Sequence, residues 1–323
     1  MKSYIRNSYG GPEVLELIEM PIPEPKANEV LIKIKAASIN PADWRIMRAD
    51  PFLVRTAMGV FKPKFKHIGA DVSGIIETVG TSVLNWEPGD EVVSDIMRCG
   101  MGAYGEYVAV PQELLVRKPK NVSFGDAAAV PIAGLTAFQA LMDYGKLQSG
   151  QRVLINGSSG GVGTYAVQIA KHYGAHVTGV CSSHNKEMVR GLGADQVIAY
   201  DLEDYRNPKE KYDLILDNVG NCSFKAAKAM LKTEGISLLI GWGGFSHMIN
   251  YMVQGGMAKL TGSKTFKGIE AKMDTGDLES LMELLSIGAI RSVIDKSFPM
   301  EQLKEAILLQ EKGRTKGKII VHN

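Results

Sequence analysis

The sequence has few cysteines and no long hydrophobic run. Its three cysteines, Cys99, Cys181 and Cys222, are scattered over 323 residues, which is typical of a reducing compartment and argues against a disulfide framework. No stretch approaches the roughly 18 consecutive apolar residues of a transmembrane helix, and the first residues lack the apolar core of a signal peptide. We therefore expect a cytoplasmic protein with no membrane insertion.

The sequence also lacks an excess of charge of either sign. It contains 37 Lys and Arg against 35 Asp and Glu, a net charge of +2, so the whole chain has no basic or acidic field that calls for nucleic acid or a membrane. Hydrophobic residues make up 45% and charged residues 22% of the chain, as in ordinary globular proteins. A length of 323 residues exceeds one ordinary core and predicts two domains.

A glycine-rich turn between a strand and a helix is the most informative feature present. The apolar run 153–156 enters the turn, and a helix-period pattern follows it. Glycines allow a sharp turn and a close approach to a pyrophosphate, which the free N–H groups at a helix start attract. Ser158 stands where the first glycine of G-x-G-x-x-G belongs, and such a turn alone is often only a tight connection. In this setting it predicts a dinucleotide site formed by Ser159, Gly160, Gly161, Val162 and Gly163.

A carboxylate is missing where NAD would require one. The next apolar strand, 177–181, ends about twenty residues beyond the turn, where an Asp or Glu holds the ribose 2′-hydroxyl of NAD. Hydroxyls, an amide and a cation stand there instead and suit the 2′-phosphate of NADPH. We expect Ser182, Asn185, Lys186 and Tyr200 around the phosphate and Ser183 among the cofactor contacts. Residues 182–185 could also cap the following helix, and the two roles are compatible.

The hydrophobic pattern changes character along the chain. Residues 1 to about 120 are rich in strand signals, and from about residue 123 helices alternate with strands. The predicted strands are 153–156, 177–181, 196–199, 213–218, 236–240 and roughly 259–264. Six strands joined by crossovers predict an α/β fold with a doubly wound parallel sheet. Two amphipathic helices and a final strand at 318–321 follow.

Nine short motifs occur along the chain in a fixed order. They are residues 10–17, 37–43, 69–74, 88–92, 105–107, 133–137, the glycine turn, 191–195 and 317–318. Together they resemble the medium-chain dehydrogenase/reductase superfamily, in its zinc-lacking quinone-oxidoreductase branch. Further pieces at 181–182, 216–220, 262–264 and 290–294 are similar to the reticulon-interacting oxidoreductases.

The resemblance implies a GroES-like β-barrel catalytic domain made of residues 1–121 and 266–323, with a Rossmann domain, 122–265, inserted into it. The active site would lie in the cleft between them, with Asn40 and Asp43 near the nicotinamide and Thr136 against its ribose or carboxamide. Residues 40–43 could instead form an Asx turn that caps a helix. We also expect further cofactor contacts from Asn218, Val219, Gly241, Trp242 and Lys318.

Zinc ligands are missing from the positions where zinc-dependent relatives carry them. The chain has Asn40 in place of a cysteine and Gly69-Ala70-Asp71 in place of Gly-His-Glu, whereas catalytic zinc needs three Cys, His or carboxylate ligands. We therefore expect a zinc-independent enzyme in which NADPH reduces a small-molecule electron acceptor. Quinones and α,β-unsaturated carbonyls fit, because the negative charge spreads onto oxygen without a Lewis acid.

Two other functions stay open. One is a trans-2-enoyl-thioester reductase, although the tyrosine that such enzymes carry soon after the Asn-Pro-x-Asp motif is absent before Tyr104. The other is an NADPH-binding regulator with low turnover. Tyr104 and Tyr107 are candidate proton donors, although aromatic packing in a loop is the commoner role of such residues. Cys99 is expected to pack rather than react.

We expect a homodimer that forms through the last predicted strand. The resemblance implies that the segment 258–265 pairs with its two-fold mate, and an open edge strand must be paired, covered or charged. Lys259 and Lys264 could instead be the protecting charges of a monomer.

Overall fold

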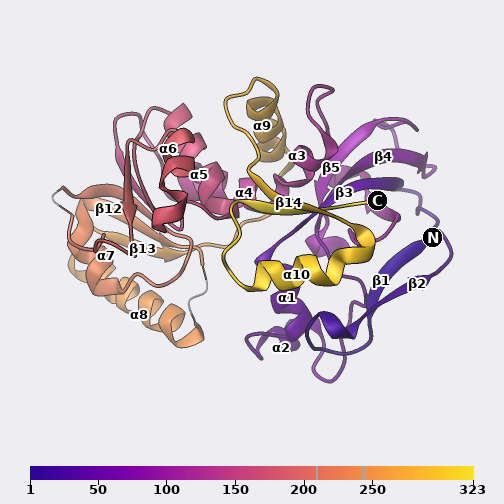
Figure 1. The fold of residues 1–323 in the computed structure, drawn as a ribbon, viewed down its shortest axis with the longest axis horizontal. Helices are drawn as coiled ribbons and strands as arrows, with labels where there is room; N and C mark the ends of the chain where they lie inside the picture. Colours follow the sequence, from indigo (N-terminus) through magenta and orange to yellow (C-terminus); the bar gives the residue numbers. More distant parts are fainter. Residues whose placement is uncertain (209, 242–243) are drawn as a thin grey trace. The chain divides into compact units, whose positions relative to one another are not determined.

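The structure is a computed structural model that describes residues 1–208, 210–241 and 244–323, with the backbone alone for residues 57, 245 and 258–261. By its internal contacts the chain divides into a first unit, 1–133 with 273–323, and a second unit, 134–272. The contacts place residues 122–133 in the first unit and residues 266–272 in the second. Figure 1 shows that the yellow C-terminal segment returns to the unit that the indigo N-terminal segment begins.

The first unit is built on a seven-stranded sheet. Its strands run in the order β14 (Ile294–Pro299), β15 (Lys318–His322), β3 (Glu29–Ile39), β4 (Asp71–Val79), β5 (Glu91–Asp95) and β7 (Val116–Arg117), and β6 (Tyr107–Pro111) also pairs with β3. β15 pairs with β3 in antiparallel register, with Ile319 opposite Ile39 and His322 opposite Ala36. The end of the chain therefore completes the sheet that its beginning starts.

Shorter elements surround this sheet. Strands β1 (Lys2–Arg6) and β2 (Leu15–Glu19) form an antiparallel pair. The α-helices are α1 (Pro41–Arg48), α2 (Val54–Met58), α3 (Phe124–Ala128), α9 (Thr275–Ser286) and α10 (Leu303–Glu311). Single 3₁₀ turns lie at Pro12–Val14, Met97–Cys99, Gln112–Leu114 and Met300–Gln302. The β-branched run of β3 explains its central place, because Val30, Ile32 and Ile34 are all buried in the core of this unit.

The second unit is a six-stranded parallel sheet with helices on both faces. Its strand order is β10 (Gln196–Ala199), β9 (His176–Cys181), β8 (Arg152–Asn156), β11 (Tyr212–Asp217), β12 (Leu231–Leu239) and β13 (Thr265–Gly268). Figure 1 shows α5 (Gly161–His172) and α6 (Lys186–Gly191) on one face, and α7 (Phe224–Met230) and α8 (Phe245–Thr261) on the other. The remaining helices are α4 (Pro131–Gln139), the π-helical turn Ala140–Tyr144 and the 3₁₀ turn Ser183–Asn185. Apolar runs such as 153–155 are buried because both faces are covered.

The predicted α/β fold with a doubly wound parallel sheet is confirmed, but the prediction of its last strand is wrong. Residues 259–261 continue α8, which ends at Thr261, and the edge strand is β13. Tyr251 and Gly255, four residues apart and both buried, have the spacing of one helix face in the segment before residue 259. Among the described residues, no helix is both long enough and apolar enough to cross a bilayer.

Candidate active site

The first candidate residues lie at the start of α1. Asn40 is the N-cap, Pro41 occupies the first helical position, and the backbone N–H of Asn40 donates to Asp43 Oδ2 at 2.7 Å. The capping role considered for residues 40–43 is therefore present. The side chain of Asn40 is engaged elsewhere, since its amide nitrogen donates to Asp71 Oδ2 at 2.9 Å.

Four buried polar side chains, which we call the Asp71 cluster, meet beside this helix start: Ser38, Asn40, Asp71 and Lys318. Asp71 Oδ2 accepts from Ser38 Oγ at 2.6 Å and from Lys318 Nζ at 3.4 Å. Its Oδ1 accepts from the backbone N–H of Ile132 at 3.0 Å. Lys318 Nζ also donates to Asn40 Oδ1. The cluster thus holds an ammonium and a carboxylate out of contact with water.

Three adjacent strands bring these side chains together. Ser38 lies at the end of β3, Asp71 opens β4 directly opposite it, and Lys318 opens β15. The sheet register therefore brings Asn40 and Lys318 together, although they are 278 positions apart in the sequence. Burial lowers the pKa of Lys318, and the nearby carboxylates of Asp71 and Asp43 oppose this effect by favouring the charged ammonium.

Asp43 is a buried carboxyl group beside the Asp71 cluster. Burial, together with the negative charge of Asp71, raises its pKa to about 7, against hydrogen bonds from Asn40 and Tyr104 that lower it. Tyr104 donates its hydroxyl to Asp43 Oδ2 at 2.9 Å, whereas Asp43 Oδ1 is buried with no hydrogen-bond partner. Asp43 can therefore gain or lose a proton near neutral pH, which is the property of a general acid or base.

The candidate proton donors are placed differently. Burial, with the charge of Asp43, raises the pKa of Tyr104 well above its usual value, so its buried hydroxyl stays protonated and positions Asp43. Tyr107 lies on β6, with Lys33 Nζ 5.9 Å from the centre of its ring. Burial raises the pKa of the Cys99 thiol to about 11, which matches its expected packing role.

The glycine turn lies in the second unit, between β8 and α5. A Cβ on Gly163 would come within 2.1 Å of the carbonyl oxygen of Gly157, so the helix can pack this close to the strand only without a side chain there. Ser158 fits at the place of the missing glycine because its hydroxyl donates to the carbonyl of Val180 at 3.0 Å. Gly160 caps α5 without a side chain, which leaves the first N–H groups of the helix for a ligand.

Buried amide groups without partners lie at the same edge of the sheet. Asn185 donates to Ser159 Oγ at 3.1 Å, but its Oδ1 has no partner. Both amide atoms of Asn218, which follows β11, are also buried and unpaired. A Cβ on Gly241 would lie 2.2 Å from the carbonyl oxygen of Asn218, so the backbone can come this close to Asn218 only where the residue is glycine. Such unsatisfied groups fit a bound polar molecule, and the residues present therefore suit a dinucleotide.

A carboxylate that no sequence pattern singled out lies beside Ser183, one of the predicted cofactor contacts. Asp201 accepts hydrogen bonds from the backbone N–H of Ser183 at 2.8 Å and from its hydroxyl at 2.6 Å. These bonds lower the pKa of Asp201, so it is ionised at neutral pH. Its position after β10, the strand beside β9, was the available signal, because neighbouring parallel strands end at one edge.

Comparison with known proteins identifies the family. Residues 26–120 match the family described as alcohol dehydrogenase GroES-like domain, and residues 192–321 match the family described as zinc-binding dehydrogenase. A chloroplast envelope quinone oxidoreductase homolog of Arabidopsis thaliana is 36% identical over 98% of this chain and 96% of its own length. The mitochondrial NAD(P)H oxidoreductase RTN4IP1 of Mus musculus is 34% identical over 100% of this chain and 89% of its own. The chain belongs to the medium-chain dehydrogenase/reductase superfamily.

Solved structures agree with this membership. The quinone oxidoreductase from Coxiella burnetii has a TM-score of 0.89 and 30% sequence identity, with 100% of this chain and 99% of that chain covered. The predicted resemblance, with a GroES-like domain and a Rossmann domain, is confirmed. Within the superfamily the chain is an NAD(P)H-dependent oxidoreductase.

The described part of the chain contains no group of three or more His, Cys, Asp or Glu side chains arranged to hold a metal ion. Asn40, which stands where zinc-dependent members of the superfamily have a cysteine, is bonded instead to the Lys318 ammonium. A second positive charge beside this ammonium would be repelled.

The other predicted site residues are dispersed. Thr136 lies half-buried in α4, Tyr200 and Val219 are exposed, and Ser182 caps the 3₁₀ turn that leads to α6. Lys318 lies in the Asp71 cluster, and its role toward a cofactor stays a prediction. Trp242 lies outside the described residues.

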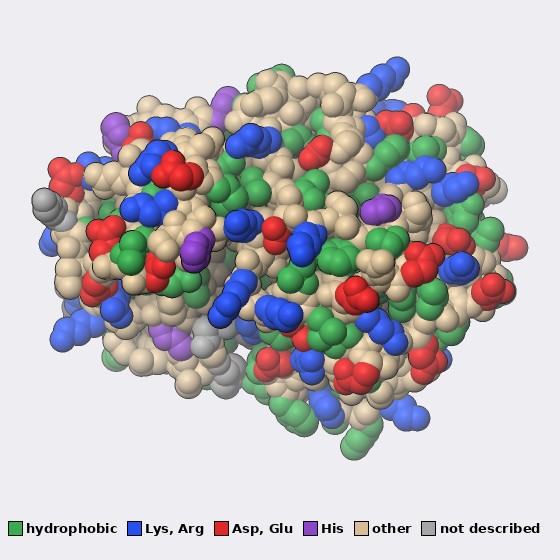
Figure 2. Space-filling view, in the orientation of Figure 1, with side chains coloured by type: hydrophobic (Ala, Val, Ile, Leu, Met, Phe, Trp, Pro, Cys, Tyr) green, Lys and Arg blue, Asp and Glu red, His purple; other side chains and the backbone are tan. Residues whose placement is uncertain are grey.

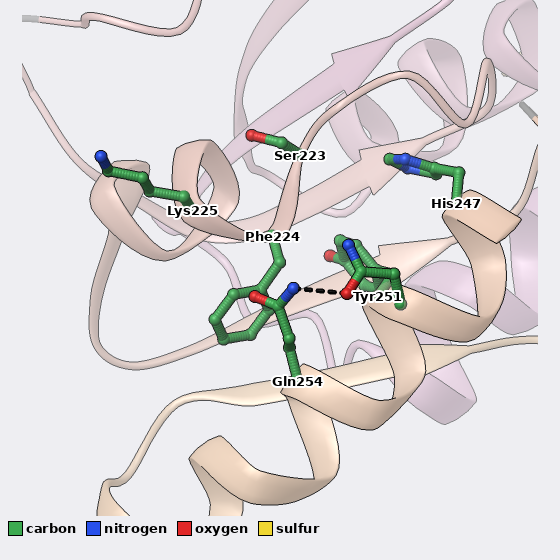
Figure 3. Close-up of a pocket in the computed structure, with 7 residues that line it drawn as sticks. Ser223, Phe224, Lys225, His247, Tyr251 and Gln254 are labelled. Atoms are coloured by element: carbon green, nitrogen blue, oxygen red, sulfur yellow. Dashed lines mark hydrogen bonds between the residues drawn. The ribbon is translucent and has the colours of Figure 1, made fainter.

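A small hollow in the second unit is separate from all of these residues. It measures about 120 Å³, and Figure 3 shows its lining side chains, which come from α7, α8 and the residue before α7. Gln254 donates to Asn250 Oδ1 at 2.6 Å beside it. The hollow contains none of the predicted site residues.

Proposed function

We propose that this member of the superfamily uses NADPH, and no zinc, to reduce quinones or α,β-unsaturated carbonyls. The observation that carries the proposal is the contact between Lys318 and Asn40. An ammonium at this point supplies positive charge where zinc-dependent relatives place a metal. A metal-free oxidoreductase needs an acceptor that is already electron-poor, and quinones and enones meet this requirement.

The nicotinamide, when bound, supplies the hydride, and the residues of the chain do the rest. We assign the pyrophosphate to the N–H groups of residues 159–163 and the unpaired amide atoms of Asn185 and Asn218 to other polar groups of the cofactor. Asn40 and Thr136 orient the reacting groups. Asp43, with a pKa of about 7, holds or releases a proton at its Oδ1.

The preference for NADPH is assigned to Ser182, Asn185, Lys186 and Tyr200, with Ser183 beside them. Asp201 works against this preference, because its negative charge repels a phosphate. Two hydrogen bonds from Ser183 already occupy this carboxylate, so we propose that NADPH still binds better than NADH.

We further propose a homodimer formed through β13, the edge strand of the second unit. The location in the cell stays a prediction. Cytoplasm is the expectation, whereas the names of the two relatives above place those proteins in a chloroplast envelope and a mitochondrion.

An NADPH-oxidation assay against quinones, enones and enoyl thioesters tests the proposal. We expect turnover with the first two classes, unchanged activity after EDTA treatment, and much less than one zinc per chain by elemental analysis. Turnover only with enoyl thioesters, or stoichiometric zinc, would overturn it. Tight NADPH binding without turnover on any acceptor would indicate a regulator instead.

A further inference from the structure

Large apolar side chains stand exposed in one segment of the first unit, residues 52–66, between α1 and β4. Phe61 is 93% exposed and Phe52 67%, with Val60 at 52% and Leu53 at 48%. Exposed apolar residues are ordinary when they are scattered singly, but four within ten positions form a patch that needs an explanation.

The same segment is basic. The sequence from 51 to 70 contains Arg55, Lys62, Lys64 and Lys66 and no Asp or Glu. The whole chain, in contrast, has a net charge of only +2. In the part of the chain that the structure describes, none of the three lysines forms an ion pair with a carboxylate. In Figure 2, green hydrophobic and blue basic side chains lie together around the region that carries α2 in Figure 1.

The segment is fastened to the body of the unit. Tyr9 donates its hydroxyl to the carbonyl of Gly59 at 2.8 Å, and the backbone N–H of Arg6 donates to the carbonyl of Lys66 at 2.9 Å. The guanidinium of Arg55 lies 4.8 Å from the centre of the Tyr9 ring and 5.0 Å from that of Phe52. The apolar and basic side chains are therefore presented together on an anchored scaffold.

We propose that residues 52–66 dock on an anionic lipid surface. Aromatic and aliphatic side chains enter the boundary between headgroups and acyl chains, while lysines next to them attract anionic headgroups. The strength of such binding grows with the apolar area that enters the membrane and with the attraction to anionic lipids, and this segment supplies both. Such a contact depends on the charges of the segment that faces the lipid, so it is compatible with a nearly neutral net charge of the whole chain.

The lipid surface accounts for both features of the segment. A second copy of the chain would have to place carboxylates against the three exposed lysines, and a lipophilic small molecule would leave these lysines without a partner. The docking surface stands independently of the proposed reaction, because it rests on exposure and charge alone.

Co-sedimentation of the full chain with vesicles tests the docking surface. We expect binding to vesicles of phosphatidylcholine mixed with phosphatidylglycerol, weak binding to phosphatidylcholine alone, and a loss of binding as salt is raised. Phe61→Ser, and separately the triple change of Lys62, Lys64 and Lys66 to Gln, should each lower the partition coefficient at least tenfold. Leu84→Ser is the matched control, because Leu84 is 86% exposed in the same unit but lies outside the segment.

Because every substituted side chain is exposed, the substitutions should change the melting temperature by no more than a few degrees, as measured by thermal unfolding. The docking surface is refuted if the wild-type chain fails to bind anionic vesicles or if Leu84→Ser reduces binding as much as Phe61→Ser. Light scattering that shows self-association lost only in Phe61→Ser would identify the patch as a protein interface and would also overturn it.

Discussion

Ser183 donates two hydrogen bonds to the carboxylate of Asp201, one from its backbone and one from its hydroxyl. Ser183 follows β9 by two residues and Asp201 follows β10 by two. The carboxylate that follows one strand is therefore bonded to the serine that follows the neighbouring strand. The sequence has no acid at the end of β9, yet the fold supplies one from the next strand. The proposed preference for NADPH therefore has to be tested at Asp201 as well as at the residues that follow β9.

Asp201→Asn should increase the preference for NADPH over NADH several-fold, because it removes a negative charge that repels the 2′-phosphate and keeps the acceptor oxygen for Ser183. Fluorescence titration with each cofactor gives the two dissociation constants. Glu203→Gln removes an exposed charge from the same loop and is the control. If both variants change the ratio of the two dissociation constants equally, the effect comes from the net charge of the loop and not from the contact between Ser183 and Asp201.

The wild-type chain should bind NADPH at least about tenfold more tightly than NADH, a difference of about 1.4 kcal/mol. The reason is the set of hydroxyls and the ammonium of Lys186 assigned to the 2′-phosphate. Ser182→Asp should reduce the difference between the two dissociation constants, because the new carboxylate repels the negatively charged 2′-phosphate. Equal dissociation constants for the two cofactors in the wild-type chain would contradict the assignment.

Lys318→Met should lower the free energy of unfolding by about 3–5 kcal/mol, because it leaves the buried carboxylate of Asp71 without its cation. Denaturant unfolding measures this change. Adding Asp71→Asn to the same chain should recover part of the loss, since the unpaired charge is then gone. Arg117→Gln breaks an exposed ion pair with Asp90 and should cost only about 0–1 kcal/mol. A loss in Lys318→Met no larger than this control would show that the buried pair contributes little.

Asp43 makes stability fall as pH rises. Its pKa is raised from 3.8 to about 7 in the folded chain, so folding favours the protonated carboxyl. The contribution of Asp43 to the free energy of unfolding is fully present below about pH 4 and is lost as pH rises through about 7. The total change in the free energy of unfolding is up to about 4 kcal/mol. Asp43→Asn keeps an oxygen to accept from Asn40 and should remove this slope. Denaturant unfolding of both chains between about pH 4 and 8 measures the difference, and identical pH profiles would contradict the raised pKa.

Gly268→Pro should disrupt the proposed dimer. The N–H of Ile269 donates inward to the carbonyl of Leu239, so in the alternating ladder of a parallel strand the N–H of Gly268 faces the open edge. Proline there removes a donor from the contact. Light scattering should show a particle of twice the chain mass for the wild type and of one chain for the variant. Lys267→Ser, which keeps its N–H, should remain dimeric, and a monomeric wild type would refute the contact.

Local patterns predicted much of the fold. The glycine turn was predictable because strand, turn and helix follow one another within about twenty residues, and Ser158 was the one departure that needed a structure to explain it. The strand predicted at 259–264 was wrong because residues 259–261 continue the helical pattern of the preceding segment, and a short apolar run does not separate helix from strand.

The Asp71 cluster lay beyond sequence reasoning for a different reason. Asn40 and Lys318 could each be singled out through motifs, but their contact depends on the register of β15 against β3, far apart in the chain. The link between Tyr104 and Asp43 depends likewise on packing. Such juxtapositions come from sheet topology, and no spacing in the sequence encodes them.

The pairing of β15 with β3 has a consequence for biogenesis. A ribosome produces the chain from one end, and domains generally fold as units during synthesis. Residues 134–272 form one uninterrupted stretch and can fold as soon as they emerge. At that stage β6 already pairs with the first half of one β3 edge, and only the second half, Ala36–Ile39, lacks its partner β15. The ammonium beside Asp71 arrives only with residue 318. The second unit can therefore be complete on the ribosome before Lys318 brings its positive charge to the Asp71 cluster.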